Sequence, residues 1–258
     1  NHEVKKSNFL KLKLNDLNNK SLKLLNKYVV KKSNDPLFSL FTSGSTGIPK
    51  GIIHSSAGYL LFAKYTCIKQ FGMNENSIVL TASDAGWING HTYSLFGPLS
   101  IGSTTILLEK PIGIIDKFFL KNIINKNQIS ILYLPVTLIR ILKSIVGKDK
   151  LFLKNKISAL GSMGEPLAKN VAKWFSSTFK KNKLSIVNTY FQTETGGIIS
   201  SPRYNSQPPN NYHGTVGKPV CENLKIILKN NQLVISTPWP GCLIGVKNGK
   251  SYFNKYWD

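Results

Sequence analysis

Short apolar segments alternate with longer amphipathic segments through most of the chain, and this alternation restricts the fold more than any other feature. The apolar segments are typical of buried strands and cover residues 37–41, 78–82, 104–108, 129–134, 156–160 and 184–188. The amphipathic segments have helical spacing and cover 57–68, 115–127, the residues after Pro135, and 166–180. Strands joined by helices run parallel, so the pattern predicts an α/β fold with a doubly wound, mostly parallel sheet and crossover helices.

The spacing within three of these helices predicts which side chains enter the core. The stripe expected for the helix at 115–127 consists of Ile115, Phe118, Phe119 and Ile123. The stripe of the helix after Pro135 consists of Leu138, Ile139, Leu142 and Ile145. The stripe of the helix at 166–180 consists of Leu167, Val171, Trp174, Phe175 and Phe179. Each apolar stripe is expected to cover one face of the sheet.

The pattern differs at the two ends of the chain. Residues 1–35 are rich in Lys and Asn, with a short helix expected at 18–28, and form an N-terminal segment of uncertain role. Residues 36–219 hold the α/β core, and 220–258 are expected to begin a small β subdomain. The chain does not start with Met and ends just after an aromatic cluster, which indicates cuts at both ends of a longer protein.

The expected β subdomain rests on one hairpin. Two apolar runs, 224–228 and 233–236, flank Asn230-Asn231. Asparagine pairs between apolar runs favour tight turns, so these segments predict an antiparallel hairpin near the C-terminus.

The chain of 258 residues is strongly basic, with 34 Lys and Arg against 12 Asp and Glu, and a net charge of +22. Its arginines are Arg140 and Arg203 alone. Nucleic-acid surfaces favour arginine for bidentate contacts to bases, so we interpret the lysines as solvated surface charge and expect no nucleic-acid partner. A basic binding module remains an alternative, which the salt dependence of DNA binding would test.

The sequence shows no pattern typical of a membrane span, a secretory signal, paired cysteines or a metal site. The longest uncharged apolar stretch, near 129–139, is shorter than the roughly 18 residues that span a bilayer. The first residues contain no apolar core of a secretory signal, so we expect no membrane partner and a cytoplasmic location. Cys67, Cys221 and Cys242 form no Cys-x-x-Cys pair, which favours reduced thiols, and the four histidines lack metal-ligand spacing.

The loop at 41–51 carries the clearest chemical signal. It contains glycines, hydroxyl side chains and a lysine, namely Thr42, Ser43, Gly44, Ser45, Thr46, Gly47 and Lys50. Glycines let backbone N–H groups approach an anion closely, and the hydroxyls and Lys50 add donors and charge. The loop is expected between a strand and a helix and predicts phosphate binding. It is no Walker A loop, because Gly51 follows Lys50, and a flexible surface loop is the alternative.

The segment 42–51 resembles the signature loop of the adenylate-forming enzymes. Three further segments, at 82–91, 161–167 and 188–197, resemble segments of the same family in the same order. The resemblance covers residue 35 to the C-terminus and is closest to AMP-forming acyl-CoA synthetases of the acetyl-CoA synthetase type. It implies that the chain is a central fragment of their large N-terminal domain, without the mobile C-terminal domain.

Two segments are expected to enclose the adenine. Gly164-Glu165-Pro166 is expected at a helix N-terminus, where Gly164 lets a flat base lie against the backbone. Tyr190 offers a ring for stacking, and Asn188 offers a donor and an acceptor for the amino edge. The resemblance adds Thr189, Phe191, Gln192 and Thr193 to the ATP-binding residues. Alternatively, Glu165 complements the helix dipole and Tyr190 is a core residue.

The resemblance also implies catalytic roles. Lys50, Thr193 and Glu194 would be the catalytic residues, with Thr193 at the α-phosphate and Glu194 holding Mg²⁺ between phosphates. A hard carboxylate oxygen suits that ion. A solvated loop acid is the alternative for Glu194.

The resemblance places the acyl pocket at Trp87, Ile88, Met163 and Phe191, and associates Asn89 with CoA. Acetate-specific members usually have Trp at the position of Phe191, Val at that of Met163 and Thr at that of Asn89. The first change enlarges the pocket and the second fills it, so a small acid of roughly two to four carbons is expected. His91 and the turn at 238–241 are expected to be structural.

The resemblance implies ATP-dependent activation of acetate or a similar short-chain carboxylate to an acyl-adenylate and then to acyl-CoA. ATP, Mg²⁺ and coenzyme A would take part. The fragment alone is expected to be inactive, because the lysine-bearing C-terminal domain is missing. The alternatives are a truncated remnant that binds nucleotide without catalysis, and a ligase for another short acid such as propionate.

Overall fold

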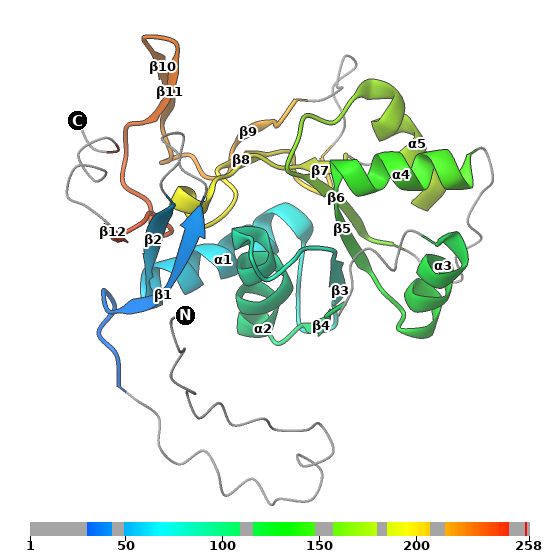
Figure 1. The fold of residues 1–258 in the computed structure, drawn as a ribbon, viewed down its shortest axis with the longest axis horizontal. Coiled ribbons are helices and arrows are strands. Elements are labelled where there is room, and N and C mark those ends of the chain that lie inside the picture. The colour runs from blue at the N-terminus through cyan, green and yellow to red at the C-terminus, as the bar shows by residue number, and fades with distance from the viewer. Residues whose placement is uncertain are drawn as a thin grey trace, which may run out of the picture. The chain divides into compact units, whose positions relative to one another are not determined.

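The computed structural model describes residues 30–42, 49–108, 116–147, 157–179, 185–206, 215–247 and 256. The chain divides into two units, Asn1–Lys32 and Ser33–Asp258. The helix expected at 18–28 lies outside the described residues. All helices and strands of Figure 1 belong to the second unit.

A five-stranded parallel sheet forms the centre of the second unit. Its strands are β3 (Ile78–Thr81), β4 (Thr104–Ile106), β5 (Ile131–Pro135), β6 (Ala159–Met163) and β7 (Val187–Asn188), in the order β4-β3-β5-β6-β7. Every neighbouring pair in this sheet is parallel. The predicted parallel α/β fold is therefore confirmed.

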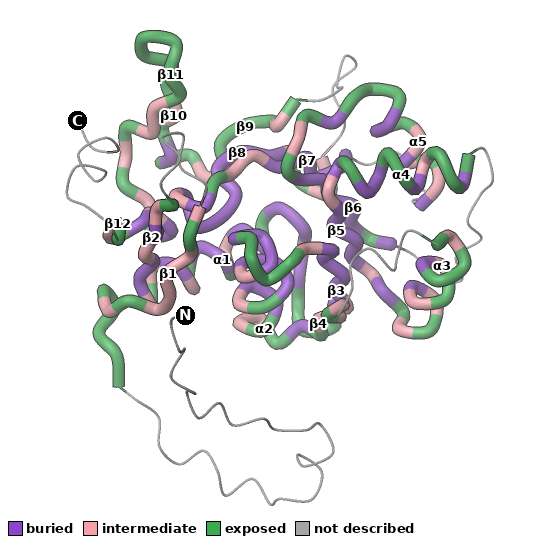
Figure 2. The backbone as a smooth tube through the Cα atoms, in the orientation of Figure 1, coloured by how far each residue is buried: buried purple, intermediate pink, exposed green. Residues whose placement is uncertain are grey.

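Helices cover both faces of this sheet (Figure 1). They are α1 (Ser56–Phe71) and α2 (Gly97–Ile101) on one side, and α3 (Lys117–Lys126), α4 (Val136–Val146) and α5 (Lys169–Phe179) on the other. Successive strand residues point to opposite faces of the sheet, so the strands contribute side chains to two separate hydrophobic cores. Leu132 and Leu160 pack in the core with α3, α4 and α5, whereas Ile131 and Tyr133 pack in the core with α1. Figure 2 shows the central strands buried.

The predicted face of α3 is wrong in phase. In α3 the buried residues are Leu120 and Ile124, whereas Phe118 and Phe119 are 66% and 44% exposed. The Asp116 side chain caps this helix by accepting a hydrogen bond from the Phe118 N–H at 2.8 Å, and packing then selects the aliphatic side. Ile115 lies outside the described residues.

In α4, Leu138, Ile139 and Leu142 are buried as predicted, but Val146 enters the core in place of Ile145. The α5 helix begins at Lys169 rather than at Pro166, although Val171, Phe175 and Phe179 are buried as expected.

A second, antiparallel sheet lies beside the first and has the order β1-β2-β12. It consists of β1 (Pro36–Thr42), β2 (Lys50–Ser55) and β12 (Gly245–Lys247). The expectation that the glycine-rich loop joins a strand to a helix is therefore wrong, because the loop joins β1 to β2. Strand β2 was not predicted, because its Lys-Gly start resembles part of the loop.

The predicted C-terminal hairpin is confirmed. It is formed by β10 (Ile226–Lys229) and β11 (Gln232–Ile235), which pair antiparallel. Asn230 and Asn231 have φ of 51° and 60°, the left-handed conformation that a two-residue turn of this kind requires. The short strands β8 (Ser200–Ser201) and β9 (Lys218–Pro219) form a further antiparallel pair. Among the described residues, no helix has the length and apolar character needed to cross a membrane.

Candidate functional site

The β1–β2 hairpin holds the two ends of the glycine-rich loop together. Thr42 and Lys50 are directly opposite each other in the antiparallel register. Ile52, in the same strand as Lys50, is fully buried and anchors the strand. The predicted phosphate-binding residues Ser43, Gly44, Ser45, Thr46 and Gly47 lie outside the described residues, so their role stays a prediction.

A tyrosine near the C-terminus joins two of the predicted catalytic residues. Lys50 Nζ donates to Tyr256 Oη at 3.0 Å, and Tyr256 Oη donates to Glu194 Oε1 at 2.8 Å. Lys50 Nζ also lies 5.2 Å from the centre of the Tyr256 ring. Burial, together with the hydrogen bond to Glu194, raises the pKa of Tyr256, so its hydroxyl keeps the proton that it donates. The structure thus brings Lys50 and Glu194 to one place.

Tyr256 was not among the predicted site residues. The signal available was its place in the aromatic cluster that ends the chain. No local pattern connects this cluster to a lysine and a glutamate so far away in the sequence, so only the tertiary structure reveals the contact.

A buried histidine connects β2 to the segment that carries Thr193 and Glu194. His54 Nε2 lies 2.7 Å from the backbone oxygen of Thr193. Burial lowers the pKa of His54 to about 4, and the Thr193 carbonyl and the Glu194 charge offset only part of that shift. The imidazole is therefore neutral near pH 7. Because a carbonyl oxygen can only accept a hydrogen bond, His54 Nε2 carries the proton and donates the hydrogen bond to the Thr193 carbonyl.

The short helix η5 (Thr193–Thr195) is held from several sides. The Gln192 N–H donates to Thr195 Oγ1 at 3.0 Å, and Trp239 Nε1 donates to the Thr195 carbonyl at 3.0 Å. The Leu243 N–H donates to the Glu194 carbonyl at 3.1 Å. Trp239 thus links the turn at 238–241 to this helix. These contacts leave the Glu194 side chain directed at Tyr256.

The neighbouring strands β6 and β7 bring the two predicted adenine segments together. Ser162 pairs with Asn188 in the parallel register. The buried Asn188 amide accepts from Ser162 Oγ at 2.9 Å and donates to the Thr215 carbonyl at 3.1 Å. Gly164 follows β6 with a φ of 87°, and a Cβ built on it would meet nothing within 4 Å. An open backbone surface therefore lies just beyond the carboxyl end of β6.

Other predicted ATP-binding residues have structural partners. The buried Thr189 hydroxyl donates to the Ser162 carbonyl at 2.9 Å and lies 2.6 Å from Tyr133 Oη. Tyr190 is half-buried, and Gln192 Nε2 donates to its hydroxyl at 3.4 Å. The binding roles of these residues stay predictions.

The expected helix N-terminus at Gly164-Glu165-Pro166 is wrong, because α5 starts three residues after Pro166. Glu165 instead pairs with Arg140 of α4, with Nη1 and Oε2 at 2.9 Å. Both side chains are partly exposed to solvent, so this ion pair contributes little to stability.

The predicted acyl-pocket residues divide into two groups. Met163 is buried, and the half-buried Phe191 packs in the same cluster, with its ring 5.8 Å from that of Tyr93. Trp87 is 67% exposed. The structure thus places Met163 and Phe191 in one hydrophobic cluster, whereas Trp87 lies at the surface.

Ile88 and Asn89 are both buried. Among the contacts of the described residues, neither the nitrogen nor the oxygen of the Asn89 amide has a hydrogen-bond partner. The proposed contact of Asn89 with CoA stays a prediction. His91 stacks on Phe38, with ring centres 5.0 Å apart, as a structural residue would.

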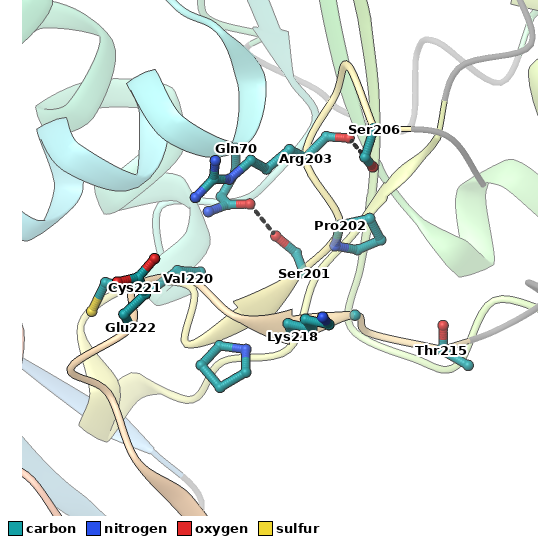
Figure 3. Close-up of a pocket in the computed structure, with 12 residues that line it drawn as sticks. Gln70, Ser201, Pro202, Arg203, Ser206, Thr215, Lys218, Val220, Cys221 and Glu222 are labelled. Atoms are coloured by element: carbon teal, nitrogen blue, oxygen red, sulfur yellow. Dashed lines mark hydrogen bonds between the residues drawn. The ribbon is translucent and has the colours of Figure 1, made fainter. Parts of the chain in front are cut away.

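A cavity of about 650 Å³ lies elsewhere in this unit (Figure 3). Gln70 of α1 lines it together with residues of β8, β9 and the adjoining loops, among them Ser201, Arg203, Lys218 and Glu222. Ser201 Oγ donates to Gln70 Oε1 at 3.0 Å. None of the predicted site residues is among those that line this cavity.

The fold and the grouped side chains define the class of protein. It is an α/β protein in which an antiparallel hairpin, bearing a glycine-rich loop, contacts the segment that follows the parallel strand β7. The model of the AMP-binding enzyme family matches residues 3–248, so the chain belongs to this family. The resemblance inferred from the four sequence segments is thereby confirmed.

Several curated relatives are acetyl-coenzyme A synthetases. The chain is 35% identical over 237 residues to acetyl-coenzyme A synthetase 2 of Kluyveromyces lactis, which covers 87% of this chain and 34% of that protein. It is 36% identical over 244 residues to acetyl-coenzyme A synthetase of Helicobacter pylori, covering 88% and 36%. It is 43% identical over 172 residues to acetyl-coenzyme A synthetase 1 of Candida glabrata, covering 66% and 24%. The chain thus spans about a third or less of the length of these relatives.

Proposed function

We propose that the protein containing this chain uses ATP to activate a short-chain carboxylate, such as acetate, to an acyl-adenylate and then to acyl-CoA. The observation that carries the proposal is the contact of Lys50 and Glu194 through Tyr256, because it unites the glycine-rich hairpin with the Thr193-Glu194 segment. The names of the relatives add the expectation that the acid is acetate.

The first step of the proposed reaction is adenylation. A carboxylate oxygen of the acid attacks the α-phosphorus of ATP, the new O–P bond forms, and the bond to pyrophosphate breaks. Negative charge builds on the departing pyrophosphate, and the Lys50 ammonium at the end of the loop would neutralise part of it. Thr193, buried beside His54, would orient the α-phosphate.

The second step transfers the acyl group. The thiolate of CoA attacks the acyl carbon, a C–S bond forms, and AMP leaves with the electrons of the C–O bond. Asn89 would contact CoA, and its amide, which has no hydrogen-bond partner among the described residues, offers a donor and an acceptor for this role.

Glu194 is the residue that would hold Mg²⁺. Its carboxylate is half-buried, and the described residues contain no group of three or more His, Cys, Asp or Glu side chains that could hold a metal by themselves. A single carboxylate fits Mg²⁺, which in proteins usually keeps water ligands and takes the rest from substrate phosphates. When bound, the ion would neutralise phosphate charge.

The adenine would lie on the open backbone at Gly164, between β6 and Tyr190. Asn188 keeps one N–H beyond its bond to Thr215, which would serve the base edge. Met163 and Phe191 would limit the length of the acyl chain. A protein that consumes ATP and CoA is also expected in the cytoplasm.

The decisive experiment is pyrophosphate–ATP isotope exchange by the complete gene product, with a panel of formate, acetate, propionate and butyrate. Exchange that depends on acetate, and is lost in Lys50→Ala, is the expected result. Exchange that is fastest with propionate would identify the other short-acid ligase. ATP binding by calorimetry without exchange on any acid would identify a nucleotide-binding remnant and overturn the proposal.

A further inference from the structure

We propose that the cavity between α1, β8 and β9 is a second binding site, and that it binds a phosphate group, either as the free ion or in a small phosphate ester. Its volume of about 650 Å³ lies within the range of protein sites for small molecules. This inference goes beyond the proposed function and does not rest on it, because none of the predicted site residues lines the cavity.

A buried amide provides the first observation. Gln70 is 1% exposed and belongs to the last turn of α1. The Tyr204 N–H donates to its backbone carbonyl at 2.8 Å, and Ser201 Oγ donates to its Oε1 at 3.0 Å, so the side chain is held in place. Its Nε2 group, which carries two N–H donors, has no hydrogen-bond partner among the described residues. Because a buried donor without a partner is costly, Gln70 favours a ligand that accepts hydrogen bonds.

Two cations match the charge of a phosphate group. Arg203 and Lys218 line the cavity and are exposed, and neither side chain forms a hydrogen bond or an ion pair within the described part of the chain. A guanidinium binds phosphate oxygens through paired N–H groups, and an ammonium adds a compact charge. With the Gln70 amide, these side chains would supply donors to the several oxygens and the double charge of a phosphate.

One carboxylate also lines the cavity. Glu222 forms no ion pair with Arg203 or Lys218, and in Figure 3 it lies apart from Gln70 and Arg203. Its charge would repel an anion, so its removal is expected to strengthen binding. The rest of the wall is partly apolar and would accommodate an organic group attached to the phosphate; it includes Pro202, Pro219 and Val220.

The cavity is distinct from the candidate nucleotide segments. Gln70 and Ser206 lie towards the amino ends of the parallel strands, because α1 leads into β3 and the Ser206 carbonyl accepts from the N–H of Ser185, just before β7, at 3.2 Å. The candidate nucleotide segments instead follow the carboxyl ends of β6 and β7. The two regions are linked at Thr215, whose carbonyl accepts from Asn188, so binding in the cavity needs a reporter of its own.

Cys221, which is half-buried and lines the cavity, supplies that reporter. The experiment measures the alkylation of Cys221 by iodoacetamide in the complete gene product, by peptide mass spectrometry at constant ionic strength. Phenyl phosphate at millimolar concentration is expected to slow this reaction several-fold and to leave the alkylation of Cys242, which does not line the cavity, unchanged. Each variant is compared with itself without ligand, so that changes in the reactivity of the thiol cancel.

Four variants test the assigned side chains. Arg203→Gln and Lys218→Gln are each expected to raise the concentration of phenyl phosphate needed for protection about tenfold, as the loss of one contact to a charged group would. Gln70→Glu keeps the acceptor for Ser201 but replaces the N–H donors by a negative charge, and it is expected to abolish protection. Glu222→Gln is expected to lower the concentration needed.

Two controls and two further ligands complete the test. Lys173→Gln, which removes an exposed lysine of α5, and Lys50→Ala are expected to leave protection unchanged. Protection by inorganic phosphate at the same concentration as phenyl phosphate would support the site with the free ion as its ligand, and weaker protection would support an ester.

Three outcomes would overturn the proposal. The first is the absence of protection by either phosphate compound, and the second is unchanged protection in both Arg203→Gln and Lys218→Gln. The third is protection by benzoate at the same concentration as phenyl phosphate, which would show that the cavity does not select phosphate. Loss of protection in Lys50→Ala would attribute the effect to the candidate nucleotide site and would also overturn it.

Discussion

The imidazole of His54 donates a hydrogen bond from Nε2 to the backbone carbonyl of Thr193 over 2.7 Å. This bond ties the strand that begins at Lys50 to the helix that contains Glu194. It is fully buried, and the low pKa of His54 keeps the ring neutral where a charge would be costly. The relative position of the two predicted catalytic residues, Lys50 and Glu194, thus depends in part on this histidine.

The stability of the protein is expected to depend on pH through His54. Burial lowers its pKa from 6.5 to about 4 in the folded state, so the unfolded chain takes up a proton first as the pH falls. Stability is therefore full above pH 6.5 and is lost as the pH falls towards 4, by up to about 3 kcal/mol in total. Urea unfolding at several pH values measures this slope.

The His54→Asn variant is expected to be less stable than the unmodified protein at pH 7, because the asparagine side chain fits the buried site less well and bonds more weakly to Thr193. It is also expected to lose most of the pH dependence of stability. His91→Asn, a change in the histidine stacked on Phe38, is the control and is expected to keep the slope. The same slope in His54→Asn as in the unmodified protein would show that other groups produce it.

Gly164→Ala is expected to weaken ATP binding about tenfold, because its Cβ would project into the open surface where the base is proposed to lie. Its φ of 87° adds backbone strain of about 1 kcal/mol. Gly147→Ala is a close control. Gly147 also has a positive φ, of 60°, and open space where a Cβ would be, but it lies at the C-terminal end of α4 and not at the proposed adenine position. Calorimetry and thermal unfolding of both variants separate strain from contact with ATP. Equal ATP affinities of the two variants would argue against the proposed adenine position.

Glu194→Gln is expected to reduce magnesium-dependent adenylation by at least about a hundredfold, because the amide loses the charge that attracts the ion. Its effect on ATP binding in EDTA is expected to be far smaller. The isotope exchange rate and its dependence on Mg²⁺ concentration measure the first quantity, and calorimetry measures the second. Glu222→Gln, at the separate cavity, is the control. Equal losses in exchange and in metal-free binding would contradict a metal role for Glu194.

Met163→Val is expected to enlarge the acyl pocket and to raise kcat/KM for propionate relative to acetate by about tenfold, the discrimination that one methylene group provides. Phe191→Trp is expected to shift the same ratio towards acetate. Because Met163 is buried, the first variant also loses about 1 kcal/mol of stability. A kinetic panel of the two acids measures the ratio, and an unchanged ratio in both variants would place the pocket elsewhere.

Much of the fold was predictable because it depends on local periodicity. The apolar runs at 131–134 and 159–160 are buried on both faces, and only strands in a covered parallel sheet show such continuous runs. The Asn-Asn turn was predictable for the same reason, since the left-handed conformation of a hairpin turn restricts the residues that form it.

Features that depend on packing were harder to predict. A helix such as α3, with apolar residues on more than one side, offers two possible faces, and the Asp116 cap and the contacts of Leu120 select between them. The strand β2 was missed because its Lys-Gly start belongs to the loop motif, and because β12, one of its two partners, comes from a distant part of the chain.

By itself, the sequence determined the class of fold, the family and the segments that hold the candidate site, because periodicity and motif spacing are properties of short stretches of chain. The tertiary structure alone decided how those segments meet. Asn188 bonds to Ser162, His54 to Thr193, and Tyr256 to both Lys50 and Glu194. Such contacts join residues far apart along the chain, and they form only when burial of the two cores fixes the strands and helices in place.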